Sequence, residues 1–399
     1  MKTAIQFGAG NIGRGFMGQL FWEAGYRTVF VEYDTDLVKM LNGAEEYPLR
    51  LLDAYTKKEI ELVIDGFEAV SAGDTGRIAE AFAEAGVAGT AVGVRNLPAI
   101  APLVAEGIKR RRESAGPAID IFLCENIYAA GETLKAEVFE LLDPAEREWA
   151  EKNVGFVGTS VARMVPAPDK RFEKEGPLFV VADSYHKLPY DKAASRAPEP
   201  PIEGMKGVPN FKAEVERKLY THNLGHAAMG YIGYLKGYTY VHEPFEDDFL
   251  LPIFEEALEE TARALVKMYP GDIDPEEHRM IRKDVKIRFG NPMLLDSLTR
   301  VARDPLRKLG PNDRLVGSAK LCLEYGIFPG NIAYICGAAF NYDHPDDPAA
   351  VELQRIIGEK GIEAAVEEVA GVVPDSDLGK EMIASVRELK ERRKVWTGK

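Results

Sequence analysis

The chain has 399 residues, is 46% hydrophobic and carries a formal net charge of −14 from 64 acidic and 50 basic side chains. This length buries a sizeable core and predicts two domains, while the acidic balance excludes nucleic-acid binding, which needs clustered basic residues with little counter-charge. No secretory leader, no run of about 18 apolar residues and no paired cysteine motif occurs, so we expect a cytoplasmic protein without a membrane partner whose three cysteines stay reduced.

The first half of the chain alternates short β-rich runs with helical patterns, which predicts a parallel sheet with crossover helices. The expected strands are residues 3–7, 28–32, 90–94, 118–126 and 178–181, with a strand-like run at 154–166. The expected helices are residues 12–24, 36–41, 97–113 and 131–142. Residues 49–54 and 59–70 predict an antiparallel excursion around a turn at 56–58. This pattern is typical of a Rossmann-type α/β domain.

The second half of the chain follows a proline-rich segment, RAPEPPIEG (196–204). Its three prolines cannot continue a helix or a central strand, so we place the domain boundary directly after it. The predicted domains are a dinucleotide-binding domain of residues 1–205 and a substrate and catalytic domain of residues 206–399. From about Phe211 onward the pattern is mostly α-helical, with long amphipathic segments at 249–268 and 352–369.

A glycine turn, FGAGNIGRG (7–15), directly follows the first expected strand and opens the first expected helix. Gly8, Gly10 and Gly13 form a G-x-G-x-x-G pattern, which in this position presents backbone N–H groups to a pyrophosphate. An alternative is that the glycines only let helix and strand pack closely. The residues that we assign to cofactor binding in the turn are Gly8, Ala9, Gly10, Asn11, Ile12 and Gly13.

Glu32 ends the second expected strand, about twenty residues beyond the turn, where a carboxylate accepts hydrogen bonds from an adenosine ribose. A carboxylate in this position repels a 2′-phosphate, so the sequence favours NAD over NADP. Asp34 is the second choice for this role, since predicted boundaries carry an error of about two residues.

A third group of polar residues lies in KLYTHNLGH (218–226), within a run that is apolar around most of its circumference and predicts a buried helix. At about 100° per residue, an α-helix places Lys218, His222, Asn223 and His226 on less than half of its circumference. Buried polar groups without partners cost roughly 1–3 kcal/mol each, so this set needs partners or a cavity.

Three interpretations of this set stay open. His222 and His226 have the spacing of a zinc helix, but that motif carries a glutamate directly after the first histidine, and this chain has Asn223 there. The set could instead be structural, with the lysine reaching solvent. The third interpretation is metal-free hydride transfer, in which a desolvated Lys218 gives up its proton near neutral pH and acts as general base.

The hydride-transfer interpretation alone explains why a dinucleotide turn and this helix share one chain. Two amide N–H₂ groups could then stabilise the developing alkoxide as an oxyanion hole. Asn126 is the candidate for the second amide, because it ends an expected strand at the carboxyl edge of the sheet, where open α/β sheets bind ligands. An asparagine in such a position is also a common turn residue or helix cap.

In these blocks the chain resembles the polyol-specific long-chain dehydrogenases. The resemblance rests on FGAGNIGRGFMG (7–18), CEN (124–126), VGFVG with R-x-V-P (154–166), KL-x-T-x-N-x-G-H (218–226) and RFGNP through DRLV (288–316). It implies a Rossmann-type N-terminal domain, a helical C-terminal domain and an active site without zinc between them. It also implies that Lys218 is the base, that Asn126 and Asn223 form the oxyanion hole and that His226 orients the substrate.

The resemblance implies the reversible reaction mannitol 1-phosphate + NAD ⇌ fructose 6-phosphate + NADH. A non-phosphorylated polyol or a sugar acid is the alternative substrate. Outside this class, the chain could be an NAD-binding sensor or a metal hydrolase that uses His222 and His226. The sequence does not fix the oligomeric state beyond a monomer or small homo-oligomer.

A sugar phosphate needs a local cationic pocket, since a net charge of −14 does not attract it. The substrate-binding candidates are Arg163, Arg288 and Lys308, with Arg307 and Arg314 beside them in sequence, and each could instead be a structural ion-pair partner. The chain also departs from the family pattern. Ala162 stands where an aspartate is usual, His222 stands where an apolar residue is usual, and residues 169–201 match poorly.

Overall fold

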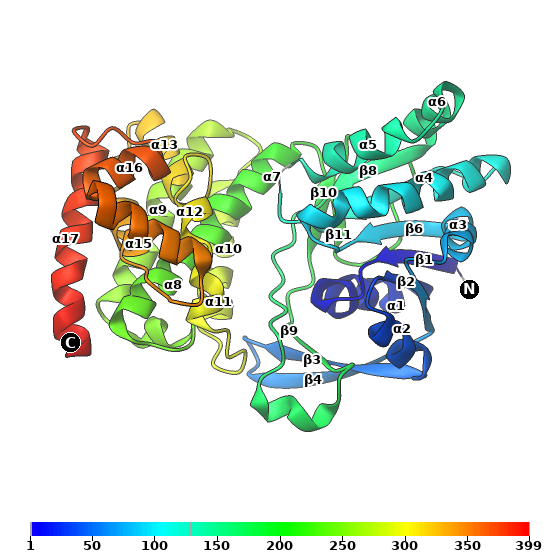
Figure 1. Ribbon diagram of the computed structural model, residues 1–399, viewed down its shortest axis with the longest axis horizontal. Coiled ribbons are helices and arrows are strands. Elements are labelled where there is room, and N and C mark those ends of the chain that lie inside the picture. The colour runs from blue at the N-terminus through cyan, green and yellow to red at the C-terminus, as the bar shows by residue number, and fades with distance from the viewer. Residues whose placement is uncertain (1, 128, 399) are drawn as a thin grey trace. The chain divides into compact units, whose positions relative to one another are not determined.

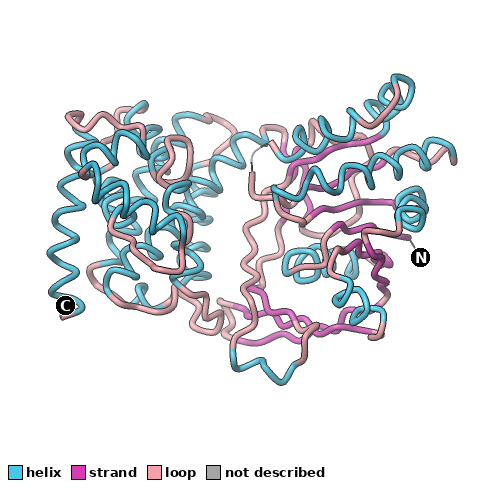
Figure 2. The backbone as a smooth tube through the Cα atoms, in the orientation of Figure 1, coloured by secondary structure: helices cyan, strands magenta, loops and turns pink. Residues whose placement is uncertain are grey.

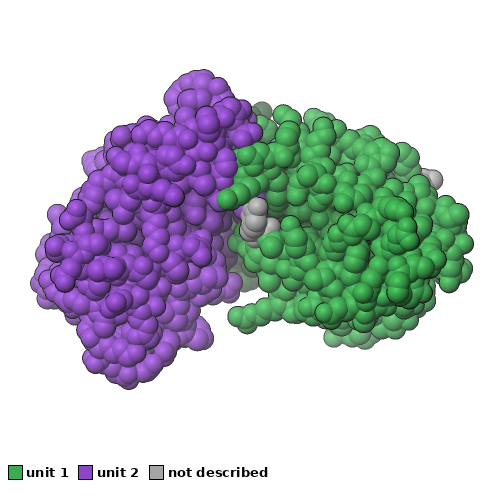
Figure 3. Space-filling model, turned by 90° about the horizontal axis from the view of Figure 1, so that it is seen from above, with its two compact units in different colours: residues 1–214 green, residues 215–399 purple. Residues whose placement is uncertain are grey.

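The computed structural model describes residues 2–127 and 129–398 and is drawn as a ribbon in Figure 1 and as a tube in Figure 2. The chain divides into two compact units, residues 1–214 and 215–399, coloured separately in Figure 3. The change from one unit to the other falls inside α7 (Phe211–Lys218). The Rossmann-type α/β unit followed by a helical unit confirms the expected fold class.

The first unit is built on a six-stranded sheet in which all neighbouring strands are parallel. In spatial order its strands are β5 (Phe67–Ser71), β2 (Tyr26–Glu32), β1 (Lys2–Phe7), β6 (Ala85–Thr90), β7 (Ile119–Leu123) and β8 (Val154–Gly158). The chain moves outward from β1 in one direction and then returns to lay β6 on the other side of β1. The strand order therefore reverses between β1 and β6, and ligands of such sheets bind at this reversal.

Helices cover one face of this sheet, and smaller sheets with two helices cover the other (Figure 1). The helices of the first unit are η1 (Gly13–Met17), α1 (Gly18–Glu23), α2 (Thr35–Asn42), α3 (Thr75–Glu84), η2 (Val94–Asn96), α4 (Leu97–Glu113), α5 (Ala130–Glu140), α6 (Pro144–Asn153) and η3 (Lys170–Glu175). Helices α3 to α6 share one apolar core with the sheet, while η1 and α1 pack on the opposite face.

Two smaller sheets complete the first unit. One has three strands, β4 (Lys58–Asp65), β3 (Glu46–Asp53) and β9 (Val180–Asp183), and the other has two, β10 (Leu188–Asp191) and β11 (Met205–Val208). Strands β3 and β4 are antiparallel, as predicted around the turn at 56–58. The sequence did not predict α3, α6, β10 or β11.

Three predicted strands of the first unit were wrong in their bounds, and one of them, the run 154–166, is a strand only over Val154–Gly158. The run 59–70 is not one strand, because Gly66 adopts φ +64° and sends residues 67–71 into the main sheet beside β2. The strand predicted at 90–94 lies at 85–90 instead. Its sequence, AGVAGT, is poor in β-formers because the strand packs closely: a Cβ on Gly89 would lie 2.3 Å from Oε1 of Gln6.

The second unit is helical. Its helices are η4 (Leu219–Asn223), α8 (Leu224–Lys236), η5 (Glu243–Glu246), α9 (Leu250–Met268), α10 (Pro275–Phe289), α11 (Leu298–Ala302), α12 (Pro305–Lys308), α13 (Val316–Glu324), α14 (Gly330–Phe340), α15 (Pro348–Lys360), α16 (Ile362–Ala370) and α17 (Asp377–Thr397). The segment predicted at 352–369 is divided by Gly361, at φ +85°, into α15 and α16. Helix α8 is buried on nearly all sides, as its apolar sequence predicted.

Two further expectations concern the whole chain. Across residues 2–127 and 129–398, no helix combines the length and apolar character that crossing a membrane requires. Cys124, Cys322 and Cys336 are all free and buried.

Candidate active site

Each of the three glycines after β1 meets a different steric demand. Gly8 has φ +88°, and a Cβ there would lie 2.6 Å from the carbonyl oxygen of Ala91 in the loop after β6. A Cβ on Gly13 would lie 2.0 Å from the carbonyl oxygen of Gly8. A Cβ on Gly10, in contrast, would meet nothing within 4 Å. Close packing therefore explains Gly8 and Gly13 but not Gly10, whereas a pyrophosphate that approaches the backbone explains all three.

Arg14 braces this turn, a role that the sequence did not reveal. The buried guanidinium donates from Nε to the carbonyl oxygen of Ala9 at 2.7 Å and from Nη1 to that of Leu178 at 2.6 Å. Asn11 is exposed and its Nδ2 donates to the carbonyl oxygen of Val165 at 3.3 Å. Arg14 and Asn11 thus tie the turn to residues 165 and 178, while the space at Gly10 stays open.

The carboxylate of Glu32 lies over the same turn. Its Oε2 accepts from the backbone N–H of Ala9 at 2.8 Å, and its Oε1 accepts from those of Tyr33 and Asp34 at 2.7 and 3.1 Å. Oε1 thus uses both of its lone pairs, while Oε2 keeps one for a ribose hydroxyl. Asp34 has a different task, because its Oδ1 accepts from two backbone N–H groups and caps α2. Of the two carboxylates, Glu32 is therefore the ribose ligand that we propose.

Glu32→Gln should weaken the preference for NADH over NADPH by about 10–100-fold, because the variant removes the charge that repels a 2′-phosphate. Fluorescence titration of the full chain with each reduced cofactor measures the two affinities. The matched control is Asp34→Asn, since asparagine caps a helix as well as aspartate does. An unchanged preference in Glu32→Gln, or a changed one in Asp34→Asn, would show that the ribose ligand is misassigned.

Asn126 lies at the carboxyl edge of the same sheet, three residues after β7, and is exposed. The residue before it, Glu125, is buried, and its carboxylate accepts from the Thr90 hydroxyl at 2.6 Å and from the backbone N–H of Val92 at 3.0 Å. Burial raises the pKa of Glu125. Glu125 thereby ties the segment after β7 to the loop after β6, next to the glycine turn. Strands β1, β6 and β7 are neighbours, so the turn and Asn126 share one sheet edge.

The helix that carries Lys218 contains a π-helical turn that no local pattern had indicated. In η4 the N–H of Leu224 donates to the carbonyl oxygen of Leu219, five residues back. A turn longer by one residue corrects the α-helical wheel, which left Asn223 about 140° away from Lys218. The π-turn instead draws Asn223 toward the lysine face. Such turns occur frequently at functional sites.

His222 and His226 form an aromatic trio with Phe289 of α10. The His226 ring stacks on Phe289 with centroids 3.8 Å apart and planes within 4°, while His222 meets both rings edge-on at 4.9 and 5.0 Å. Burial lowers the pKa of both imidazoles well below the usual value, so both are neutral near pH 7. In the described part of the chain, Nε2 of His226 has no hydrogen-bond partner. This buried nitrogen therefore lacks the hydrogen-bond partner that a substrate hydroxyl would supply.

The histidine pair lacks the further ligands that a metal site needs. Among residues 2–127 and 129–398, no group of three or more His, Cys, Asp and Glu side chains is arranged to hold a metal ion. The carboxylate of Asp296 could act as a third ligand, but it lies 4.0 Å from Nε2 of His226 and already forms an ion pair with Arg300. Two imidazoles alone do not complete a zinc site.

The candidate cations of the second unit fall into two groups. Lys308 is buried, and its ammonium donates to the carbonyl oxygens of Val301 and Arg303, which ties α12 to the end of α11. Arg288, at the end of α10, is 4% exposed, and its charge acts on both His222 and His226. Arg288 therefore lies beside the predicted catalytic set, while Lys308 holds main-chain carbonyls.

The remaining arginines of this region form ion pairs. Arg307 binds Asp304 and Asp313, each at 2.8 Å, and Arg314 binds Asp313 with its Nε at 2.8 Å. Arg314 is also buried, and its positive charge contributes to the low pKa of His226. Of these two arginines, Arg314 is the one whose charge reaches the histidine pair.

Arg163 belongs to the first unit and is buried against the glycine-turn helix. Its Nη1 donates to Oε1 of Gln19 at 2.7 Å, its Nε donates to the carbonyl oxygen of Asp183 at 3.0 Å, and its guanidinium lies 5.1 Å from the Phe16 ring centroid. These contacts join the segment after β8 to η1 and β9. Arg163 lies in the first unit, whereas Arg288 and Lys308 lie in the second.

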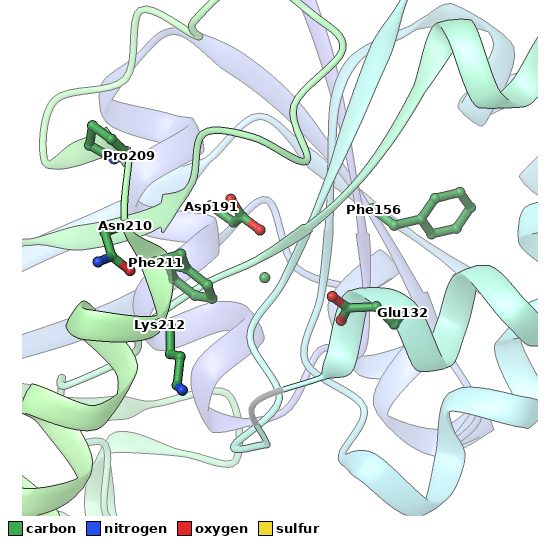
Figure 4. Close-up of a pocket in the computed structure, with 8 residues that line it drawn as sticks. Glu132, Phe156, Asp191, Pro209, Asn210, Phe211 and Lys212 are labelled. Carbon is green, nitrogen blue, oxygen red and sulfur yellow. The ribbon is translucent and has the colours of Figure 1, made fainter.

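A hollow of about 200 Å³ opens in the first unit, between α5, β8, β10 and the start of α7 (Figure 4). Its lining residues are Glu132, Phe156, Gly158, Asp191, Pro209, Asn210, Phe211 and Lys212. None of the predicted cofactor or catalytic residues belongs to this lining. We therefore locate the cofactor by the glycine turn at the β1–β6 reversal and not by this hollow.

Comparison with known proteins gives two family matches that together span the chain. The mannitol dehydrogenase Rossmann domain matches residues 2–204, and the mannitol dehydrogenase C-terminal domain matches residues 210–396. Curated relatives include mannitol-1-phosphate 5-dehydrogenase of Thermoanaerobacter pseudethanolicus, 36% identical over 98% of this chain and 99% of that protein. The enzyme of the same name from Bacillus subtilis is 38% identical over 92% of this chain and 95% of that protein.

Two solved structures share the whole fold. Substrate-free D-sorbitol dehydrogenase has a TM-score of 0.80 and 17% identity and covers 98% of this chain and 93% of its own. The mannitol 2-dehydrogenase of Pseudomonas fluorescens, in a ternary complex with NAD and D-mannitol, has a TM-score of 0.78 and 18% identity. The match covers 99% of this chain and 93% of that one. At these identities the likeness shows a common fold.

Proposed function

The chain belongs to the mannitol dehydrogenase family, and from this premise we propose that it interconverts mannitol 1-phosphate and NAD with fructose 6-phosphate and NADH. The relatives of nearly full length support this substrate pair, since they carry the name mannitol-1-phosphate 5-dehydrogenase. The observation that carries the proposal is that one chain joins an open dinucleotide turn with Glu32 to a π-turned helix that bears a lysine, an amide and an imidazole.

The proposed chemistry assigns one task to each residue. NAD, bound through the glycine turn and Glu32, supplies the hydride acceptor. As the hydride leaves the alcohol carbon, Nζ of Lys218 takes the hydroxyl proton as general base. The amide N–H₂ groups of Asn126 and Asn223 stabilise the developing alkoxide, and the unpaired Nε2 of His226 orients the substrate hydroxyl. No step in this sequence uses a metal ion.

The phosphate group requires cations, and we propose that Arg288 is the principal one in the second unit. Its charge lies close enough to His222 and His226 to lower the pKa of both, so it belongs to the same neighbourhood as the catalytic set. A guanidinium binds phosphate oxygens in bidentate geometry. Arg288 itself pairs with Asp284 at 3.4 Å, so its charge on both histidines, and not a free guanidinium, sets it apart from Lys308 and Arg163.

The purified protein should oxidise NADH rapidly with fructose 6-phosphate and at least about 100-fold more slowly with fructose or a keto sugar acid. A substrate without a phosphate group leaves the buried guanidinium of Arg288 without its bidentate partner. Absorbance of NADH measures all three rates, and a chelator should leave them unchanged. Equal rates with fructose would refute the phosphate assignment. Activity that is lost on chelation and restored by zinc would refute the metal-free mechanism, and NADH binding without turnover of any ketose would indicate a sensor.

We also propose a reducing, cytoplasmic location, which the three free buried cysteines support. The functional modules that we propose are residues 1–205 and 206–399, and the family matches at 2–204 and 210–396 support that division. A monomer or a small homo-oligomer remains our expectation for the assembly.

A further inference from the structure

The π-turn of η4 leaves one main-chain carbonyl without the donor that a regular helix would provide. In an α-helix the N–H of Leu224 would bind the carbonyl oxygen of Tyr220, but here it donates to Leu219 and Thr221. The hydroxyl of Thr261, on α9, lies 2.9 Å from this Tyr220 oxygen. Thr261 is fully buried, so no water competes for the contact.

The hydroxyl of Thr261 has two possible acceptors. Its hydroxyl also lies 3.1 Å from the carbonyl oxygen of Leu258 in its own helix, and a hydroxyl has one proton to donate. The Leu258 oxygen accepts from its own helix in any case, whereas the Tyr220 oxygen does not receive the N–H of Leu224 that an α-helix would give it. The bond to Tyr220 therefore replaces a donor that the π-turn has moved elsewhere.

A second bond holds the next residue of the turn from α10. The hydroxyl of Thr221 lies 3.1 Å from Nε2 of His278, and both residues are 1% exposed. Burial lowers the pKa of His278 to about 3, so the ring is neutral near pH 7. Nδ1 of His278 has no partner in the described part of the chain. A proton on Nε2, donated to Thr221, avoids burying an unpaired N–H at Nδ1.

Packing keeps the helix from rotating away from these two bonds. Directly after the π-turn, a Cβ on Gly225 would lie 2.8 Å from Cε2 of Phe254 on α9. On the α10 side, Phe289 stacks against His226 with centroids 3.8 Å apart. Directly after the turn, the helix thus packs against both α9 and α10.

We propose that Thr261 and His278 are positioning residues, which hold the π-turn and thereby keep Lys218 and Asn223 on one face of their helix. This inference rests on the proposed function for the roles of Lys218 and Asn223, because it explains how a base and an oxyanion donor that an α-helix would separate act together. Both positioning residues lie behind the turn, on the neighbouring helices α9 and α10.

Thr261→Val keeps the shape of the side chain and removes its hydroxyl. Turnover of fructose 6-phosphate should fall by about 10–100-fold, because misaligned proton transfer slows the chemical step. The affinity for NADH should stay within twofold of wild type. The deuterium isotope effect on kcat with 4-deuterated NADH should rise, since chemistry then limits turnover. Thr261→Ser restores the hydroxyl and should restore kcat and the isotope effect to within about threefold.

The matched control is Ser385→Ala, which also removes a buried hydroxyl, on α17, where residue 385 packs against Gly337 of α14. This variant should lose stability without any change in isotope effect. If Thr261→Val loses stability alone, with wild-type kcat and isotope effect, Thr261 has no positioning role and the proposal fails. Should Thr261→Val not fold, Thr221→Val against Thr221→Ser breaks the second bond and is judged by the same two outcomes.

Hydrogen exchange of the full chain separates this inference from the function on which it rests. The amides of residues 219–224 should exchange at least about tenfold faster in Thr261→Val than in wild type or Thr261→Ser. If wild type reduces no ketose but the exchange result holds, the proposed function fails and the bracing of the turn stands. Unchanged exchange in Thr261→Val overturns the bracing whatever the substrate.

Discussion

Replacing Lys218 with methionine should lower kcat for fructose 6-phosphate reduction by about 10³–10⁴-fold, near the upper end of what general acid–base catalysis contributes. Methionine keeps the length and apolar stem of lysine but has no proton to exchange. In the reductive direction the alkoxide needs a proton as the hydride arrives, and Nζ of Lys218 is the group proposed to supply it. Binding of NADH depends on the first unit and should remain within twofold, as measured by fluorescence titration.

The matched control is Lys212→Met, which removes an exposed lysine from the same helix, α7. It should leave kcat within twofold of wild type. Small primary amines should partly rescue Lys218→Ala but not Lys218→Met, whose side chain fills the space. The variant should also lack the pH limb that titration of Lys218 should give wild type in kcat/KM. Near-normal turnover in Lys218→Met would mean that another group is the base.

Much of the first unit follows from local sequence, because its elements are set by short-range patterns. The glycine turn, Glu32 and the strands around them combine a steric requirement with a period-two apolar pattern, and both can be found without knowing the fold. Strand β6 escaped prediction for a physical reason. Its small residues allow β6 to lie close to β1, and this steric requirement becomes visible only in the structure, where Gly89 pairs with Gln6.

The sequence alone singles out the helix that we propose to be catalytic, but it does not predict the geometry of that helix. Lys218, Asn223 and His226 stand out as polar residues in an apolar helix, and the family resemblance assigns them roles. The π-turn that brings Lys218 and Asn223 together depends on Thr261 and His278, which lie on other helices. Helix propensity over five residues carries no information about such distant braces.

Two other contributors to the site went unnoticed because their signals are tertiary. Arg14 looks like a surface residue after a glycine turn, yet its guanidinium is buried and holds the turn from behind. Glu125 stands in the CEN block, and only the parallel neighbours β6 and β7 show that it pins the loop at Val92. Arg14 and Glu125 share one structural feature: each is a buried charged side chain that binds the backbone of a loop next to the predicted cofactor site.

Acid should destabilise this protein steeply, because three histidines of the second unit are buried in the neutral form. Burial lowers the pKa of His278 from 6.5 to about 3 and lowers the pKa of His222 and His226 well below 6.5. Above about pH 6.5 each imidazole is neutral in the folded and the unfolded chain, so stability does not depend on it. Below that value each imidazole is protonated in the unfolded chain but stays neutral in the folded chain.

The free energy of unfolding should therefore fall as the pH drops from about 6.5 toward 3, by about 2 kcal/mol at pH 5 for His278 alone. His222 and His226 act with the same sign. Denaturant unfolding followed by far-ultraviolet circular dichroism, which reports mainly on the helical second unit, measures this dependence between about pH 8 and pH 5.

His278→Gln isolates one contribution, because the glutamine amide can still donate to Thr221 but does not titrate. At about pH 8 the variant differs from wild type only by packing, so that comparison serves as the internal control. Between pH 8 and 5 the variant should lose about 2 kcal/mol less than wild type. Identical losses would mean that the ring of His278 titrates inside the fold as it does in the unfolded chain, and a buried ring held neutral would then be the wrong description of this contact to Thr221.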